Sequence, residues 1–139
     1  MGAAENKKLM EEVYAALAKG SGEPFVDALA DDVRWTIIGT TDWSGTWEGK
    51  RAVRERLLDP LFAQFGTQYR NRAIRVIAEG DCVVIECRGD VTTKDGRPYN
   101  NSYCNVFRLE AGKVRELTEY CDTELIAEAL KPRGLAAAA

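Results

Sequence analysis

The sequence contains no histidine, and this absence excludes more chemistry than any other feature of its composition. A chain without histidine has no imidazole general base, no Ser-His-Asp triad and no histidine-bound metal. Its cysteines lack C-x-x-C spacing and lie in strand-like segments, so we expect free thiols in a reducing compartment. The available chemistry is that of Asp, Glu, Tyr, Lys, Arg and Cys, and we expect neither a metal nor a cofactor.

Long apolar runs and concentrated positive charge are also missing. No apolar run approaches the roughly 20 residues of a membrane-spanning helix, and the polar start has no signal-peptide core. We therefore expect a cytoplasmic protein with no membrane partner. The net charge is −3 and the positive residues are scattered, apart from a cluster at 50–56. A phosphate-binding surface needs a concentrated positive patch, so nucleic acid is not an expected partner.

The composition that is present is typical of one globular domain. With 139 residues, 45% of them hydrophobic, the chain is long enough for a single core. We expect the domain to cover residues 1–132. The alanine-rich residues 133–139 are expected to form a disordered tail or to remain from cloning.

The period of the apolar residues changes along the chain. Helical spacing predicts helices over 6–19, 23–30, 50–65 and 123–131. Alternation predicts strands over 33–38, 69–79, 82–93, 99–109 and 114–122. Residues 39–50 are expected to form a loop that folds its two tryptophans over something apolar. This order predicts an α+β domain whose helices cover one face of a curved antiparallel sheet.

The last two strands carry Asn105 and Glu119 where an apolar core is normally found. A three-residue turn at 110–112 would make the two residues diagonal neighbours on one face, whereas a two-residue turn would place them on opposite faces. A carboxyl group in an apolar cavity loses hydration, so its pKa rises toward neutrality and it can exchange protons. Glu119 is therefore a candidate general base or water activator. Asn105 is a candidate donor to a ligand oxygen.

Residues 82–93 add two further candidates. By alternation, Arg88 and Asp90 share one face of this strand, on which they could orient Glu119 and donate a proton. Alternating charges on a strand equally fit a solvated face. Both faces of the sheet carry large apolar residues, which suggests helices on one side and a partner subunit on the other.

The chain resembles a known family in several segments: "AALAKG", "ADDVRWTIIG", the G-x-W-x-G-K segment and "VFRLEAGKVRELTEYCD". Together they are similar to the SnoaL-like branch of the nuclear transport factor 2-like (NTF2-like) superfamily, which includes ketosteroid isomerases, limonene epoxide hydrolase and polyketide cyclases. The resemblance implies a cone-shaped fold with one deep apolar pocket, and usually a homodimer. One such scaffold serves many reactions, so the resemblance identifies the fold better than the chemistry.

The resemblance also implies roles for individual residues. Glu119 with Arg88 and Asp90 is similar to the carboxylate and Arg-x-Asp pair of limonene epoxide hydrolase, whose water-holding Tyr and Asn correspond to Trp35 and Ile37. The catalytic Asp of ketosteroid isomerase also falls on Ile37. Its oxyanion Tyr falls on Val13, one place before Tyr14, and its hydrogen-bonding acid falls on Asn105. The polyketide cyclases commonly pair an acid with a histidine, which this chain lacks.

Three functions stay open from the sequence. The first is a cofactor-independent acid/base enzyme of hydrolase, isomerase or cyclase type acting on a small, mainly apolar molecule. The second is a non-catalytic binding or carrier module with the same pocket. The third is a structural domain whose pocket is filled by tryptophans. The expected ligand-binding residues, besides Asn105, are Trp35, Ile37, Tyr103, Trp47, Tyr14, Leu117 and Cys121.

Overall fold

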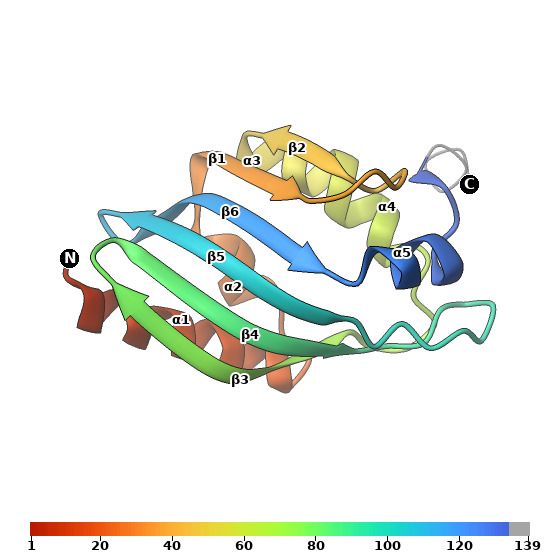
Figure 1. The fold of residues 1–139 in the computed structure, drawn as a ribbon, viewed down its shortest axis with the longest axis horizontal. Helices are drawn as coiled ribbons and strands as arrows, with labels where there is room; N and C mark the ends of the chain where they lie inside the picture. Colours follow the sequence, from red (N-terminus) through yellow and green to blue (C-terminus); the bar gives the residue numbers. More distant parts are fainter. Residues whose placement is uncertain (134–139) are drawn as a thin grey trace.

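The computed structural model describes residues 1–133 and has the predicted α+β architecture (Figure 1). The proposed tail therefore lies, apart from Arg133, outside the described residues. The elements of the first half are α1 (Ala3–Ala18), α2 (Glu23–Ala28), β1 (Leu29–Ile37), β2 (Gly45–Glu48), α3 (Lys50–Ala52), η1 (Val53–Leu58) and α4 (Asp59–Phe62). Those of the second half are β3 (Arg70–Glu79), β4 (Cys82–Asp90), β5 (Ser102–Glu110), β6 (Lys113–Cys121) and α5 (Thr123–Ala129).

One sheet holds all six strands in the order β2-β1-β6-β5-β4-β3. The pairing is antiparallel except between β1 and β6, which run parallel. The strand β2 lies inside the segment expected to be a loop, where Trp47 pairs with Trp35 of β1. This short edge strand was not predicted for two reasons: the glycines of the segment are typical of a loop, and four residues are too few to show the alternation of a strand.

The predicted helix over 50–65 is divided into three parts by its proline. Pro60 has no N–H to donate and its ring crowds the preceding turn. The preceding turns widen into the π-helix η1, at whose end the Asp59 N–H bonds the Arg54 carbonyl. π-helical turns inside α-helices are rare and occur frequently at functional sites.

The hairpin between β5 and β6 places Asn105 and Glu119 on one face, as expected, but with a different turn and register. Its turn has two residues, Ala111 and Gly112, both with positive φ (52° and 77°), and Glu110 pairs with Lys113. A bulge beyond Leu109 then shifts the register by one residue, so Asn105 lies directly opposite Glu119. The two-residue turn alone would separate these side chains, and the bulge returns them to one face.

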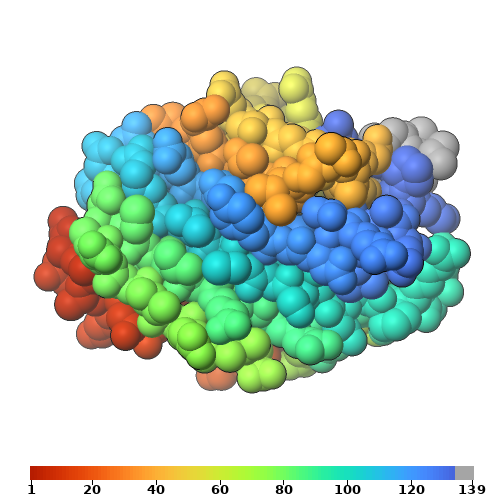
Figure 2. Space-filling view, in the orientation of Figure 1, coloured from red at the N-terminus to blue at the C-terminus, as the bar shows by residue number. Residues whose placement is uncertain are grey.

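The helices α1 and α2 and the segment from α3 to α4 lie on one face of the curved sheet (Figure 1). The core fills the space between this inner face and the helices, with Met10, Val33, Phe107 and Leu117 almost fully buried. Strands β3 to β6 are at the surface of the opposite, outer face (Figure 2). Among residues 1–133, no helix combines the length and the apolar character needed to cross a membrane.

Candidate functional site

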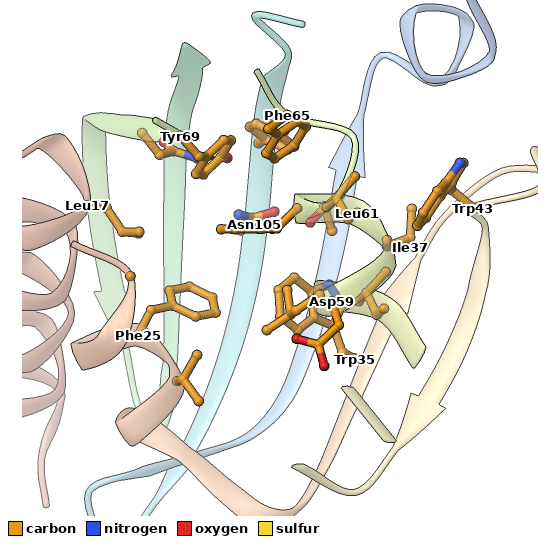
Figure 3. A pocket seen from close by; sticks show the side chains of 18 of the residues that line it. Leu17, Phe25, Trp35, Ile37, Trp43, Asp59, Leu61, Phe65, Tyr69 and Asn105 are labelled. Atoms are coloured by element: carbon orange, nitrogen blue, oxygen red, sulfur yellow. The ribbon is translucent and has the colours of Figure 1, made fainter. Parts of the chain in front are cut away.

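A cavity of about 520 Å³ lies between the inner face of the sheet and the helices (Figure 3). In this view Phe25 approaches from the side of α2, and Asp59 and Leu61 approach from α4. The volume is in the range of small-molecule sites, and the lining is mainly aromatic and aliphatic. Its polar lining residues are Tyr14, Glu23, Arg54, Asp59, Tyr69, Asn71, Tyr99, Tyr103, Asn105 and Glu119.

Glu119 lies in β6 on the same strand face as Leu117, and only 8% of its surface is exposed. Among residues 1–133 no cation pairs with its carboxyl group, and the Trp35 indole and the Cys121 thiol are hydrogen-bonding groups beside it. Burial raises the pKa of Glu119 to about 7, and the nearby Trp35 indole and Cys121 thiol oppose this rise only in part. The Trp35 Nε1 atom itself has no hydrogen-bond partner in the described chain. Glu119 can therefore gain and lose a proton near neutral pH.

Asn105 and Tyr14 form a polar pair beside Glu119. The Asn105 Nδ2 donates to the Tyr14 Oη at 3.2 Å, and the Cys87 thiol approaches the same oxygen at 3.9 Å. Burial raises the pKa of Tyr14 well above its usual value, so its phenol is neutral. Asn105 lies directly opposite Glu119, and the Cβ atoms of such a cross-strand pair are about 5 Å apart, so the two residues are neighbours on the inner face of the sheet.

Tyr69 and Asn71 form a second polar pair at another part of the wall. The Asn71 Nδ2 donates to the Tyr69 Oη at 2.9 Å. The Tyr69 ring stacks on Phe65 with centroids 5.6 Å apart and an interplanar angle of 10°. Burial also raises the pKa of Tyr69, so this phenol is neutral as well. Figure 3 shows Tyr69 beside Phe65, with Asn105 below them in this view.

Six of the residues predicted from the sequence meet in this cavity. These are Tyr14, Trp35, Ile37, Tyr103, Asn105 and Glu119. Tyr14, and not Val13, reaches the cavity from α1; Val13 is packed in the core. The orientation of α1 therefore turns Tyr14 toward the cavity, whereas the family resemblance placed the corresponding tyrosine at Val13.

The structure corrects the expected placement of Arg88 and Asp90. Alternation along β4 turns Val83, Ile85 and Cys87 inward, so Arg88 and Asp90 are exposed on the outer face. They share a strand face, as expected, but that face is turned away from Glu119. The cost of burying an unpaired charge explains why the apolar set faces the core.

Three predicted lining residues do not line the cavity either. Leu117 is packed in the core against its cross-strand neighbour Phe107. Trp47 is buried, with the Arg133 guanidinium 5.2 Å from its ring centroid. Cys121 is half-buried and does not line the cavity, but its thiol lies beside the Glu119 carboxyl.

Sequence reasoning missed Tyr69 and Asn71 as site residues. A signal was present, because Tyr69 and Asn71 alternate with Arg70 and Arg72 at the start of β3, so one face carries neutral polar groups and the other carries charge. Residues 1–133 contain no group of three or more Cys, Asp or Glu placed to hold a metal ion.

Known proteins support the fold and the family. Residues 10–117 match the SnoaL-like domain. A search of curated proteins found no match. Because the matched region spans most of the sequence, the chain belongs to the SnoaL-like family.

Solved structures with the same fold have low sequence identity. An NTF2-like protein of unknown function from Burkholderia pseudomallei K96243 is 23% identical with a TM-score of 0.77, over 91% of this chain and 97% of that one. TerC, co-crystallised with polyporic acid, is 22% identical with a TM-score of 0.75, over 89% and 96% of the two chains. A putative SnoaL-like polyketide cyclase from Jannaschia sp. CCS1 is 16% identical with a TM-score of 0.72, over 94% and 95%.

Proposed function

For this SnoaL-like protein we propose a cofactor-independent acid/base enzyme that moves a proton on a small, mainly apolar carbonyl compound, as an isomerase or cyclase does. The observation that carries the proposal is the position of Glu119: its carboxyl group is buried beside an apolar cavity and has no cation partner in the described chain, and this burial raises its pKa to about 7. A structural carboxylate in a core is normally paired. Glu119 is placed instead beside space that a ligand can fill.

The proposed step uses two groups of the cavity. The Glu119 carboxylate takes a proton from the carbon next to the ligand carbonyl, and the C–H electron pair forms the new C–C double bond. The carbonyl π electrons move to its oxygen, where the Tyr14 hydroxyl donates a hydrogen bond to the enolate. Protonated Glu119 then returns its proton to the same carbon or to another one, so the enzyme is unchanged.

Asn105 supports this step by polarising Tyr14. The Tyr14 oxygen accepts hydrogen bonds from Asn105 and from the Cys87 thiol, which leaves its own hydrogen for a ligand. Accepted hydrogen bonds strengthen the bond that a hydroxyl donates. Epoxide hydrolysis is less well supported, because Arg88 and Asp90 face away from Glu119.

Exchange of α-hydrogens with deuterated water tests the proposal without the physiological substrate. Incubation of 1-tetralone and 2-tetralone with the protein, followed by mass spectrometry, measures the transfer directly. We expect exchange above the buffer rate, and we expect Glu119→Gln to lower it by about 10²- to 10⁴-fold. The matched control is Glu116→Gln, on the same strand, where the carboxyl group pairs with Arg108 at 3.1 Å.

The alternative is a binding or carrier module with the same cavity. It predicts that the ketones bind and that neither the wild type nor Glu119→Gln exchanges their hydrogens above the buffer rate. Equal exchange by the wild type and Glu119→Gln would contradict the assignment of Glu119.

The outer face of the sheet is the proposed interface of a homodimer. Ile74, Ile77 and Tyr120 are 55%, 53% and 47% exposed there, although they are large apolar residues. They border a shallow groove with Val84 and Cys104. A second copy would remove this apolar strip from water, and a two-fold axis places the same surface on both partners.

A further inference from the structure

Buried polar atoms without a partner are concentrated at the cavity. Within residues 1–133, the buried side-chain atoms that form no hydrogen bond are Trp35 Nε1 and the Oδ1 atoms of Asn6, Asn71 and Asn105. All of these residues except Asn6 line the cavity. An unpaired buried polar atom costs stability, so each one in a folded protein needs an explanation. A ligand that fills the cavity would supply the missing partners.

The proposed reaction accounts for two of these atoms. The Trp35 indole lies beside the Glu119 carboxyl group, and Asn105 lies opposite Glu119 on the neighbouring strand. A ligand whose carbonyl group is bound at Tyr14 is next to both residues. Asn71 is on another strand, β3, and has no role in the proposed proton transfer. Its free Oδ1 atom therefore needs a separate explanation.

Asn101 shows how a buried asparagine is bonded when it serves only the fold. Its Nδ2 donates to the Tyr99 Oη at 3.2 Å, as the Nδ2 of Asn71 does to Tyr69. The Nδ2 of Asn101 also donates to the Asp122 carbonyl, and its Oδ1 accepts from the Asp122 N–H at 3.0 Å. Both polar atoms of Asn101 are thus used within the fold, whereas the amide of Asn71 is only half used.

Tyr69 fixes the orientation of the Asn71 amide. The Asn71 Nδ2 donates to the Tyr69 Oη at 2.9 Å, so Oδ1 is the atom that stays free. The Tyr69 ring is itself held by stacking on Phe65, and its oxygen lies over Gly89, where a Cβ would be only 3.3 Å away. Gly89 is also the cross-strand partner of Asn71. A fixed amide is a preorganised acceptor, because little side-chain entropy is lost when a ligand binds to it.

We infer that Asn71 is a specificity-determining residue of the cavity: its Oδ1 accepts a hydrogen bond from a hydroxyl or N–H group of the ligand, so the ligand is a carbonyl compound that also carries such a donor. The inference rests on the proposed function for the carbonyl group alone. One small ligand can reach both positions because the Cys87 thiol adjoins both. Its sulfur is 3.9 Å from the Tyr14 Oη, and Asn71 is another of its hydrogen-bonding neighbours. A ligand without the donor is disfavoured, because it leaves the buried Oδ1 unpaired.

Hydroxylated 1-tetralones and their methyl ethers are matched probes of this acceptor. The 5-, 6- and 7-hydroxy isomers place a donor at different positions, the methyl ethers keep the oxygen without its hydrogen, and 1-tetralone lacks both. Quenching of tryptophan fluorescence reports binding, since Trp35 and Trp43 line the cavity. Mildly acidic pH keeps Glu119 protonated and the phenols neutral. We expect at least one hydroxy isomer to bind about tenfold more tightly than both its methyl ether and 1-tetralone, the gain from one hydrogen bond to an otherwise unpaired acceptor.

Asn71→Leu should abolish this preference without weakening the binding of 1-tetralone, because leucine is similar in size and has no acceptor. Asn6→Leu is the matched control: it removes the same kind of buried, unpaired amide oxygen from α1, outside the cavity lining, and should keep the preference. The comparison among the three kinds of probe needs no variant, so it decides the inference even where Asn71→Leu does not fold.

Three results would overturn the inference. They are equal affinity of the wild type for each hydroxy isomer and its methyl ether, a preference that survives in Asn71→Leu, and no binding of any probe. A methyl ether that binds as tightly as its hydroxy isomer, and more tightly than 1-tetralone, would show that the Asn71 amide presents Nδ2 to the cavity.

Failure of this inference is distinguishable from failure of the proposed function, because one is measured by binding and the other by hydrogen exchange. A protein that shows the hydroxyl preference but no exchange is a binding module with a donor-specific site. A protein that exchanges the ketone hydrogens but shows no preference is an enzyme whose ligand does not use Asn71.

Discussion

The substitution Glu119→Gln should stabilise the folded protein in a pH-dependent way. The pKa of this carboxyl group is 4.5 in its ordinary state and about 7 in the fold, because burial penalises the charged form. Above pH 4.5 the unfolded chain holds fewer protons at this group than the folded chain does. The stability of the wild type therefore falls as the pH rises from 4.5 to 7, and it levels off above 7.

The size of the effect follows from the same shift. A rise from 4.5 to about 7 corresponds to about 3 kcal/mol of unfolding free energy lost across this range. Glutamine has no charge to bury, so it does not lose this stability. The free energy of unfolding of Glu119→Gln, minus that of the wild type, should therefore grow by up to about 3 kcal/mol, or about 10 °C in Tm.

Urea denaturation of both proteins across this pH range measures the difference. Any constant cost of fitting the glutamine amide cancels, because the prediction concerns the change with pH. Glu116→Gln is the control with the opposite sign: the Arg108 guanidinium lowers the pKa of Glu116, so its contribution is present above the ordinary pKa and is lost on acidification. A difference for Glu119→Gln that does not vary with pH would refute the claim that its carboxyl group is desolvated.

Two further predictions concern the outer face. Arg88→Ala and Asp90→Asn should each leave ketone hydrogen exchange within about twofold of the wild type, because neither side chain reaches the cavity; a large loss would place them in the mechanism after all. If the proposed homodimer forms, Ile77→Lys should convert it to a monomer in analytical ultracentrifugation, because this substitution puts a charge into the proposed apolar interface. A dimer that survives this change would require another interface.

The fold was predictable because most elements have a clear apolar period. Both the helix α1 and the strands β3 to β6 were expected within a few residues of their observed bounds. The edge strand β2 was not expected. Its formation depends on pairing with β1, and a segment of four residues is too short for its sequence pattern to predict that pairing. The helix expected over 50–65 is divided near Pro60, and the π-helical form of its middle part was not expected.

The site was predictable in part. Asn105 and Glu119 were expected on one face through a register that the structure does not have, and the bulge in β6 produces the same outcome. Alternation along β4 shows which residues share a face but not which face is inward. The orientation of the candidates Arg88 and Asp90 was therefore left open by the sequence, and the structure places both on the outer face. Tyr69 was missed because its role depends on the amide of Asn71 and on the space over Gly89, which form only in the folded sheet.

We infer that the Glu119 carboxyl group beside the cavity exchanges its proton near neutral pH. Carbon-13 NMR of protein labelled at the glutamate side-chain carboxyl group tests it directly, with Glu119→Gln to assign the resonance. We expect one resonance that titrates at about pH 7, is absent from Glu119→Gln and changes its titration when 2-tetralone fills the cavity. Titration of all the glutamates near their ordinary pKa is the opposite outcome. That outcome would show that no glutamate of the protein is desolvated beside the cavity.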